Sequence, residues 1–347
     1  MKKMSPYQLL PGMRLGRDVY TFGDQLLLPA GAVLDQYSIT KLQECISSVT
    51  VMEETTRSQE IQNSPDFLNF SKAFLEKLSV FKEDLTDVVN NENSLDTNHL
   101  LDSTLSMVEN ARGALHIFDM LYNMRHVDDL TFAHSLNVAL ICNILAEWQG
   151  MSREEVEIAT LSGLLHDIGK LVLPEDIVNK KEPLTPEEDE IFRKHTYEGY
   201  RILTEKGVDR RIANAALMHH ERCDGTGYPF RYNADKIDKF AKIVSIANDY
   251  DTTPSPDKNV KEPCPFSIIQ MLEKEGLRKY DSFFVMTFLE NVINSFISHT
   301  VQLTDGRKGE VVFVNKQHPS RPLIKTIDGK FIDLSKEPLS LTIEKIL

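Results

Sequence analysis

Helical periodicity through the middle of the chain, from Ser64 to about Thr300, is the feature that most constrains its fold. In FLNFSKAFLEKLSVFKEDLTDVV the apolar residues recur at spacings of three and four, and Pro65 stands near the start. A polar run over 90–98 interrupts the pattern, which resumes with LLDSTLSMVENARGALHIFDMLYNM. Because no strand-like alternation intervenes, we predict an all-helical central unit. Its first helices form a connector that could also mediate a homodimer.

Both ends of the chain instead show strand-length apolar runs separated by turn residues, such as Pro11-Gly12 and Asp305-Gly306. The segment SITKLQEC, from Ser38 to Cys45, predicts one short helix with a serine cap. The expected fold is therefore mainly α, with a small β-rich module at each end. The expected divisions are a β-rich module over 1–60, a helical connector over 61–124, a helical domain over 125–298 and a second β-rich module over 299–347.

Composition narrows the class of protein. The 347 residues carry a formal net charge of −13, which argues against a nucleic-acid polymer as partner because phosphate backbones need clustered positive charge. No run of eighteen apolar residues indicates membrane insertion, and no apolar segment follows the first lysines as in a secretory signal. The four cysteines lack metal-site or disulfide spacing, so we expect reduced thiols in a cytoplasmic protein.

Histidines concentrate at helical patterns between residues 134 and 220. Burying such groups is costly unless a partner compensates, and one divalent cation can pair with several of them. Five imidazoles and one aspartate are enough for two metal ions if the aspartate bridges, since a carboxylate offers two oxygens. Mixed nitrogen and oxygen donors favour iron, manganese or a similar ion over calcium. The six residues are His134, His166, Asp167, His195, His219 and His220.

The order of these motifs resembles the HD-GYP family, a subgroup of the HD phosphohydrolases, over about residues 125–295. The matching elements are His134-Ser135, HDIGK at 166–170, His195 with Gly199, and HHERCDGTGYP at 219–229. The flanking β regions resemble those attached to some HD-GYP proteins of Gram-positive bacteria. The resemblance implies a bacterial signalling hydrolase with an all-α fold that converts cyclic di-GMP to pGpG and onward to GMP, using two metal ions and a bridging hydroxide.

The resemblance also implies roles for individual residues. His134, His166 and Asp167 would hold one metal, Asp167 would bridge, and His195, His219 and His220 would complete the second site. Asp167 and Lys170 would be catalytic, with Lys170 directed at the substrate phosphate. Glu221 and Asp224 would orient histidines or cap the following loop. The loop over the substrate would be shaped by Gly225, Gly227, Tyr228 and Pro229.

Three positions depart from the family pattern. Asn248 stands where a metal-binding Asp is usual, so its metal site should be weaker, although Asp249 would substitute after a local shift. Leu130 replaces the Glu of three-metal members, which favours two metals despite the neighbouring Asp128 and Asp129. The usual phosphate-binding Arg corresponds to Asp257, with Lys258 or Lys261 as alternative cations, and lysine offers only a point charge.

These departures leave three functional hypotheses open. The leading one is a cyclic di-GMP phosphodiesterase with two divalent ions, most plausibly iron or manganese. The second is a catalytically weak or inactive receptor that binds cyclic di-GMP or a protein partner. The third is an HD phosphohydrolase acting on another cyclic dinucleotide or on a nucleotide.

Overall fold

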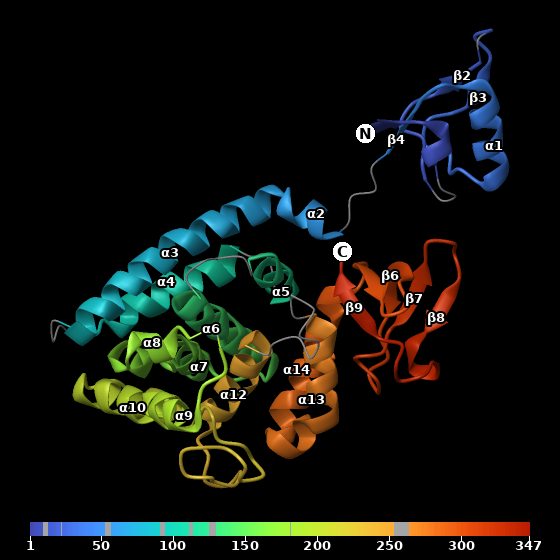
Figure 1. Ribbon diagram of the computed structural model, residues 1–347. Helices are drawn as coiled ribbons and strands as arrows, with labels where there is room; N and C mark the ends of the chain where they lie inside the picture. The colour runs from blue at the N-terminus through green and yellow to red at the C-terminus, as the bar shows by residue number, and fades with distance from the viewer. Residues whose placement is uncertain are drawn as a thin grey trace.

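The computed structural model describes the 347-residue chain except for residues 10–12, 22, 53–56, 91–93, 111–113, 125–129, 181 and 253–263. Its middle is helical and both ends carry strands (Figure 1), so the prediction of a mainly α chain with β-rich ends is confirmed. Within the described ranges, no helix combines the length and the apolarity needed to cross a membrane.

The N-terminal module has a small hydrophobic core of its own, built around Leu15, Leu34 and Leu42. In it β1 pairs with β4 and β2 with β3, both antiparallel. The predicted serine cap is wrong, because the helix starts two residues earlier and Asp35 accepts the backbone N–H of Ser38 at 2.7 Å. The elements are β1 (Lys2–Met4), η1 (Pro6–Gln8), β2 (Val19–Tyr20), β3 (Leu26–Leu28), α1 (Gln36–Cys45) and β4 (Val49–Val51).

The connector leads into the helical core through one long helix, α3 (Pro65–Asn90). It buries Phe74, Leu78, Phe81 and Leu85 at the three- and four-residue spacing of a single helix face. Figure 1 shows α3 running along the outside of the bundle. The other helices of this part of the chain are α2 (Arg57–Gln62), α4 (Thr97–Asn110) and α5 (Ala114–Asn123).

The helical core is centred on two helices, α6 (Leu130–Trp148) and α7 (Arg153–Leu165), that pack at short distance. A Cβ added to Gly163 would lie 2.9 Å from Ala139 Cα, so the two backbones approach this closely only with glycine there. Ser152 and Glu155 form a reciprocal cap that starts α7. The remaining helices are η2 (Ile168–Val172), α8 (Glu175–Val178), α9 (Pro186–Arg193), α10 (His195–Glu205), α11 (Arg210–Met218), α12 (Lys239–Thr252), α13 (Pro265–Lys279), α14 (Ser282–Val292) and η3 (Ile293–Phe296).

The C-terminal strands form a five-stranded antiparallel sheet with the order β8-β7-β6-β5-β9. Its buried residues, including Val301, Val311 and Ile324, belong to the same hydrophobic cluster as the helical core. Ser320 also donates to Glu273 of α13. The sheet therefore packs on the helices. Its elements are β5 (Thr300–Leu303), β6 (Lys308–Phe313), β7 (Leu323–Thr326), β8 (Phe331–Asp333), η4 (Leu334–Lys336) and β9 (Ile343–Ile346).

Candidate metal centre

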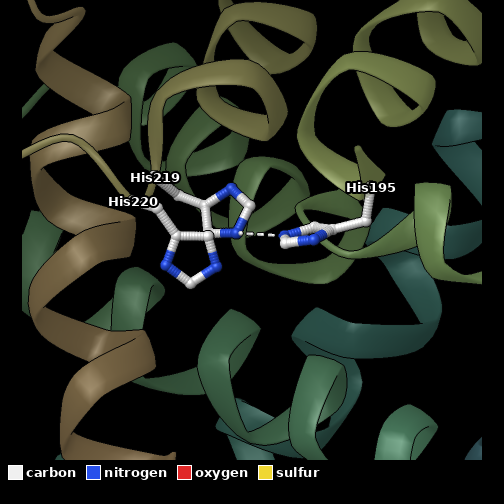
Figure 2. A group of neighbouring side chains, drawn as sticks. All are labelled: His195, His219 and His220. Atoms are coloured by element: carbon white, nitrogen blue, oxygen red, sulfur yellow. Dashed lines mark hydrogen bonds between the residues drawn. The ribbon is translucent and has the colours of Figure 1, made fainter. Parts of the chain in front are cut away.

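The structure brings the six residues expected to bind metal into two adjacent groups, in each of which the candidate ligand atoms lie within 4.8 Å of one another. His134 lies on α6, and His195 is the first residue of α10. His166 and Asp167 directly follow the end of α7. His219 and His220 follow the end of α11. Figure 2 shows His195 facing this pair across the site. The two groups are His134, His166 and Asp167, and His195, His219 and His220.

Asp167 lies between these groups. Its Oδ2 is 3.2 Å from His166 Nε2 and 3.8 Å from His134 Nε2. The other oxygen, Oδ1, is 3.6 Å from His195 Nε2 and 3.8 Å from His219 Nε2. Each carboxylate oxygen therefore faces one histidine group, which is the arrangement that a bridging carboxylate requires.

Three of the histidine rings are oriented by the same kind of hydrogen bond, from Nδ1 to the backbone carbonyl three residues earlier. The Nδ1 of His166 donates to Gly163 O at 2.7 Å, that of His195 to Phe192 O at 2.7 Å, and that of His219 to Ala216 O at 2.8 Å. A carbonyl oxygen can only accept, so the proton must be on Nδ1 in each case. The lone pair of each Nε2 then points into the site, which is the tautomer that a metal-binding histidine needs.

Because these Nε2 atoms are all acceptors, the site contains more hydrogen-bond acceptors than hydrogen-bond donors. His195 Nε2 and His219 Nε2 face each other at 3.3 Å (Figure 2), and both are acceptors. Among the described residues, His166 Nε2 and Asp167 Oδ1 are buried without a hydrogen-bond partner. Buried unsatisfied acceptors are costly, and a cation is the group that would satisfy all of them. The residues thus fit a pair of metal ions.

Protonation of His195, His219 or His220 does not supply the missing donors at neutral pH. Burial lowers the pKa of His195 to about 4 and holds the pKa values of His219 and His220 well below the ordinary histidine value. Burial pushes the pKa of Asp167 upward, but His166 and Lys170 outweigh it, so that this pKa lies well below its usual range. His195, His219 and His220 are therefore neutral imidazoles beside an ionised carboxylate, the forms that bind metal.

Asn248 lies beside the first group. Its Oδ1 is 3.1 Å from His134 Nε2, and its Nδ2 donates to Asp249 at 3.1 Å, which fixes the orientation of the amide. His134 Nδ1 lies 2.7 Å from Asp251, whose second oxygen accepts from Asn137. The sequence analysis did not assign Asp251 this orienting role, although a carboxylate one helical turn from a candidate ligand could have indicated it.

Asp249, the alternative ligand, is engaged elsewhere. Its carboxylate accepts two hydrogen bonds from Arg222, at 2.7 and 2.9 Å, and one from the hydroxyl of Tyr280. The structure therefore places Asn248, and not Asp249, next to His134. Asp128, Asp129, Asp257, Lys258 and Lys261 lie outside the described residues.

Lys170 contacts the Asp167 carboxylate. Its Nζ is 2.5 Å from Asp167 Oδ2 and lies 5.3 Å from the ring centroid of Phe192. The lysine was expected to face a substrate phosphate, and in this structure its partner is Asp167. A cation at this position lies at the edge of the metal centre.

Gly169 allows the short 3₁₀ helix η2 to lie directly on α10. A Cβ at this position would be 2.0 Å from His195 O and 2.5 Å from Gly199 N. This close approach is what brings Asp167, two residues earlier, up to His195. The glycine of the HDIGK motif therefore has a packing role that sets the geometry of the site.

The loop after the paired histidines is held by Glu221. This buried carboxylate accepts the backbone N–H groups of Phe230 at 2.6 Å and Tyr232 at 2.9 Å, which closes the loop on its own start. A Cβ on Gly227 would lie 2.4 Å from His220 O, so the loop packs on the backbone of the histidine pair. Glu221 thus caps the loop, one of its two expected roles.

Two side chains of the same loop have identifiable partners. The ring of Tyr228 stacks on His220, with centroids 4.5 Å apart and planes at 21°, and the Arg193 guanidinium lies 4.5 Å from the Tyr228 centroid. Asp224 accepts from the backbone and hydroxyl of Thr226 at 3.1 and 2.6 Å. Tyr228 therefore supports a candidate metal ligand, and Asp224 caps a turn. Gly225 has a φ of +75°, while Pro229 is exposed at the loop surface.

Substituting Glu221→Gln should loosen this loop. The amide can accept only through its oxygen, and its NH2 group would face a backbone N–H, so we expect a loss of about 1–3 kcal/mol of stability. Faster hydrogen exchange at the amides of Phe230 and Tyr232 would accompany a lower melting temperature. Glu198→Gln, which alters an exposed ion pair with Arg201, is the matched control and should change little. Unchanged exchange at both amides would contradict this account of the loop.

The fold gathers histidines from separate helices around one aspartate carboxylate, which defines a helical protein with the donor groups for metal ions. Residues 101–283, just over half of the chain, match the HD domain family. The chain belongs to this family, and its motifs are consistent with the HD-GYP subgroup.

Three curated relatives show how this similarity is distributed. The cyclic di-GMP phosphodiesterase PA4108 of Pseudomonas aeruginosa is 32% identical over 222 residues, covering 63% of this chain and 52% of that protein. The cyclic di-GMP phosphodiesterase of Thermotoga maritima is 33% identical over 193 residues, covering 55% and 50%. The 3'3'-cGAMP-specific phosphodiesterase 2 of Vibrio cholerae is 32% identical over 139 residues, covering 38% and 27%. The chain spans about half the length of the first two.

Proposed function

We propose that this protein is a metal-dependent phosphodiesterase that hydrolyses cyclic di-GMP to pGpG, to GMP or to both. The observation that carries the proposal is the position of Asp167, whose two oxygens each face a different histidine group. The names of two relatives, cyclic di-GMP phosphodiesterases that are 32% and 33% identical to this chain, support the same substrate.

We further propose that the two groups hold two divalent ions, iron or manganese. His134, His166 and Asn248 would hold one ion and His195, His219 and His220 the other, with Asp167 shared. Two such ions, when bound, neutralise phosphate charge and supply a nucleophile from water at neutral pH. The donor set supports this choice because imidazole with carboxylate oxygen suits first-row ions.

The residues of the chain itself would bind and orient the substrate around this centre. Lys170 would place a positive charge beside the reacting phosphate, and Asp167, which accepts from it, fixes its position. The carbonyl partners of His166, His195 and His219 keep these rings in one tautomer. The loop capped by Glu221 would hold His220 in place through Tyr228.

We propose a cytoplasmic location, which is supported by the four cysteines, none of them in a disulfide, because thiols persist in a reducing compartment. We also propose a homodimer through the connector. Leu68 and Leu75, seven residues apart on α3, are 57% and 50% exposed, which is the spacing of a helix–helix seam.

A weakly active receptor is the second candidate function, and Asn248 is the observation that favours it. Its amide oxygen would bring no charge to the first metal site. Substituting Asn248→Asp should therefore raise metal affinity about tenfold, a typical size for changes in metal coordination. Titration of the metal-free protein with Mn²⁺ measures this, and turnover should rise in parallel. Equal affinity and equal turnover in the two proteins would contradict a role for Asn248 at the metal.

A substrate panel tests the proposed reaction. Manganese-loaded protein under reducing conditions should convert cyclic di-GMP to pGpG or GMP faster than it converts 3'3'-cGAMP or cyclic di-AMP. Preference for 3'3'-cGAMP would point to the specificity named for the Vibrio cholerae relative. Tight binding of cyclic di-GMP without hydrolysis would instead establish the receptor.

A further inference from the structure

A cavity of about 450 Å³ lies beside the metal centre, in the size range of roughly 300–1,000 Å³ that small-molecule sites occupy. It is bounded by α3, the start of α6, η2 and α8. The polar and charged residues that line it are Lys82, Thr86, Asn90, Thr131, Lys170, Glu175 and Asn179.

Two of these residues connect the cavity to the metal centre. Lys170 lines it and also contacts Asp167 Oδ2 at 2.5 Å. Thr131 lies three residues before His134, and therefore on the same side of α6. A ligand whose phosphate reached the metal groups would extend into this cavity.

The outer wall is formed by α3, which precedes the segment that matches the HD domain family. Lys82, Thr86, Val89 and Asn90 are spaced by four, seven and eight residues, so they share one face of the helix. The helix packs into the protein through a different face, which includes Phe81, Leu85 and Val88. The face on the cavity therefore borders the packing face, and Val89 of the cavity lining also packs against the core.

Two of the three charged side chains that line the cavity are positive, which suits an anion, and the third is Glu175. Lys82 and Lys170 both line the cavity, in a chain whose formal net charge is −13. Lys82 Nζ lies 5.6 Å from the ring centroid of Phe132 on α6, which positions the ammonium at the wall. A cyclic dinucleotide carries two phosphodiesters, and when one is at the metal centre the other needs a positive charge elsewhere.

We propose that the connector helix α3 completes the substrate site: Lys82 binds the second phosphate of the cyclic dinucleotide, and Thr86 and Asn90 hydrogen-bond its nucleoside. This inference rests on the proposed function. It makes α3 a determinant of affinity for cyclic dinucleotides over simple phosphodiesters.

Steady-state kinetics of the full, manganese-loaded chain tests this with two substrates. Cyclic di-GMP has a second phosphate, whereas bis(4-nitrophenyl) phosphate has one phosphate and no nucleoside. Lys82→Ala should raise the KM for cyclic di-GMP about tenfold, as expected for losing one charge-assisted hydrogen bond, and leave kcat unchanged. Its hydrolysis of bis(4-nitrophenyl) phosphate should equal that of the wild type. Lys72→Ala, at an exposed lysine of the same helix, is the matched control and should behave as wild type.

Each result that contradicts the prediction rejects a different part of the proposal. An unchanged KM for cyclic di-GMP in Lys82→Ala would overturn the assignment of the cavity while leaving the proposed function in place. An equal loss on both substrates would also overturn it, because Lys82 would then act through the metal centre or the fold. A wild-type protein that cleaves bis(4-nitrophenyl) phosphate but not cyclic di-GMP would overturn the proposed function, and the cavity assignment with it, before any substitution is made.

Discussion

Replacing Asp167 by asparagine should lower the hydrolysis of cyclic di-GMP by about a thousandfold or more. The amide keeps the shape of the side chain but removes the negative charge and leaves one oxygen to serve two histidine groups. Metal ions contribute several kcal/mol to such reactions, and each 1.4 kcal/mol corresponds to about tenfold in rate. Metal content measured on the same sample should fall below two ions per chain.

The matched control for this change is Asp176→Asn. Asp176 lies in the first turn of α8 and is exposed, so both metal content and turnover should stay at the wild-type level. Wild-type turnover in Asp167→Asn would contradict the assignment of a bridging role to this carboxylate.

Substituting Gly169→Ala should destabilise the protein by about 3 kcal/mol or more, at the upper end of overpacking effects. The added methyl group would lie 2.0 Å from His195 O, so η2 and α10 would have to separate. Asp167 and His195 would separate with them, and metal binding should weaken. Thermal unfolding and metal titration measure the two effects.

Gly199→Ala is the contrasting variant, because this residue faces Gly169 across the same contact. A Cβ on Gly199 would meet Gly169 N at 3.4 Å and Ala216 Cβ at 3.5 Å, which are ordinary contact distances. Alanine is also favoured over glycine inside a helix by up to about 1 kcal/mol. We therefore expect little loss or a small gain in stability. If Gly169→Ala were tolerated as well as Gly199→Ala, the close packing of η2 would not set the site.

The sequence was sufficient to predict which histidines lie together in one site. Several polar side chains at the ends of apolar helices are costly to bury, and a shared cation is the simplest group that compensates for them. It could not predict the partners that hold these side chains. Asp251 contacts His134 across 117 residues of sequence, and the ion pair between Arg222 and Asp249 joins a loop to α12. Such pairs depend on how the helices pack, which local patterns do not encode.

Local interactions also explain the serine cap that was predicted wrongly and the contact between Lys170 and Asp167. The N-terminal helix begins at Gln36 because the Asp35 carboxylate, and not the Ser38 hydroxyl, accepts a backbone N–H of the first turn. Lys170 lies on Asp167 because a charged carboxylate three residues earlier is within its reach. The helical periodicity and the turn residues, by contrast, were strong enough to predict the α core and the β-rich ends.

The wall that α3 contributes to the cavity illustrates a further limit of sequence reasoning. Its residues Lys82, Thr86 and Asn90 belong to no motif, and each is typical of an exposed helix surface. Only the position of α3 beside η2 and α8 brings them near Lys170. Their proposed role therefore depends on tertiary structure.

Metal content and cyclic di-GMP turnover, measured together on the wild type and on His166→Ala, test the central claim most directly. His166 Nε2 is buried without a hydrogen-bond partner among the described residues, and its loss should remove one ligand of the shared centre. We predict about two manganese or iron ions per wild-type chain with release of pGpG or GMP, and the loss of both metal and turnover in the variant. A wild-type chain that binds no metal under reducing conditions, or a His166→Ala variant that retains full turnover, would contradict the account.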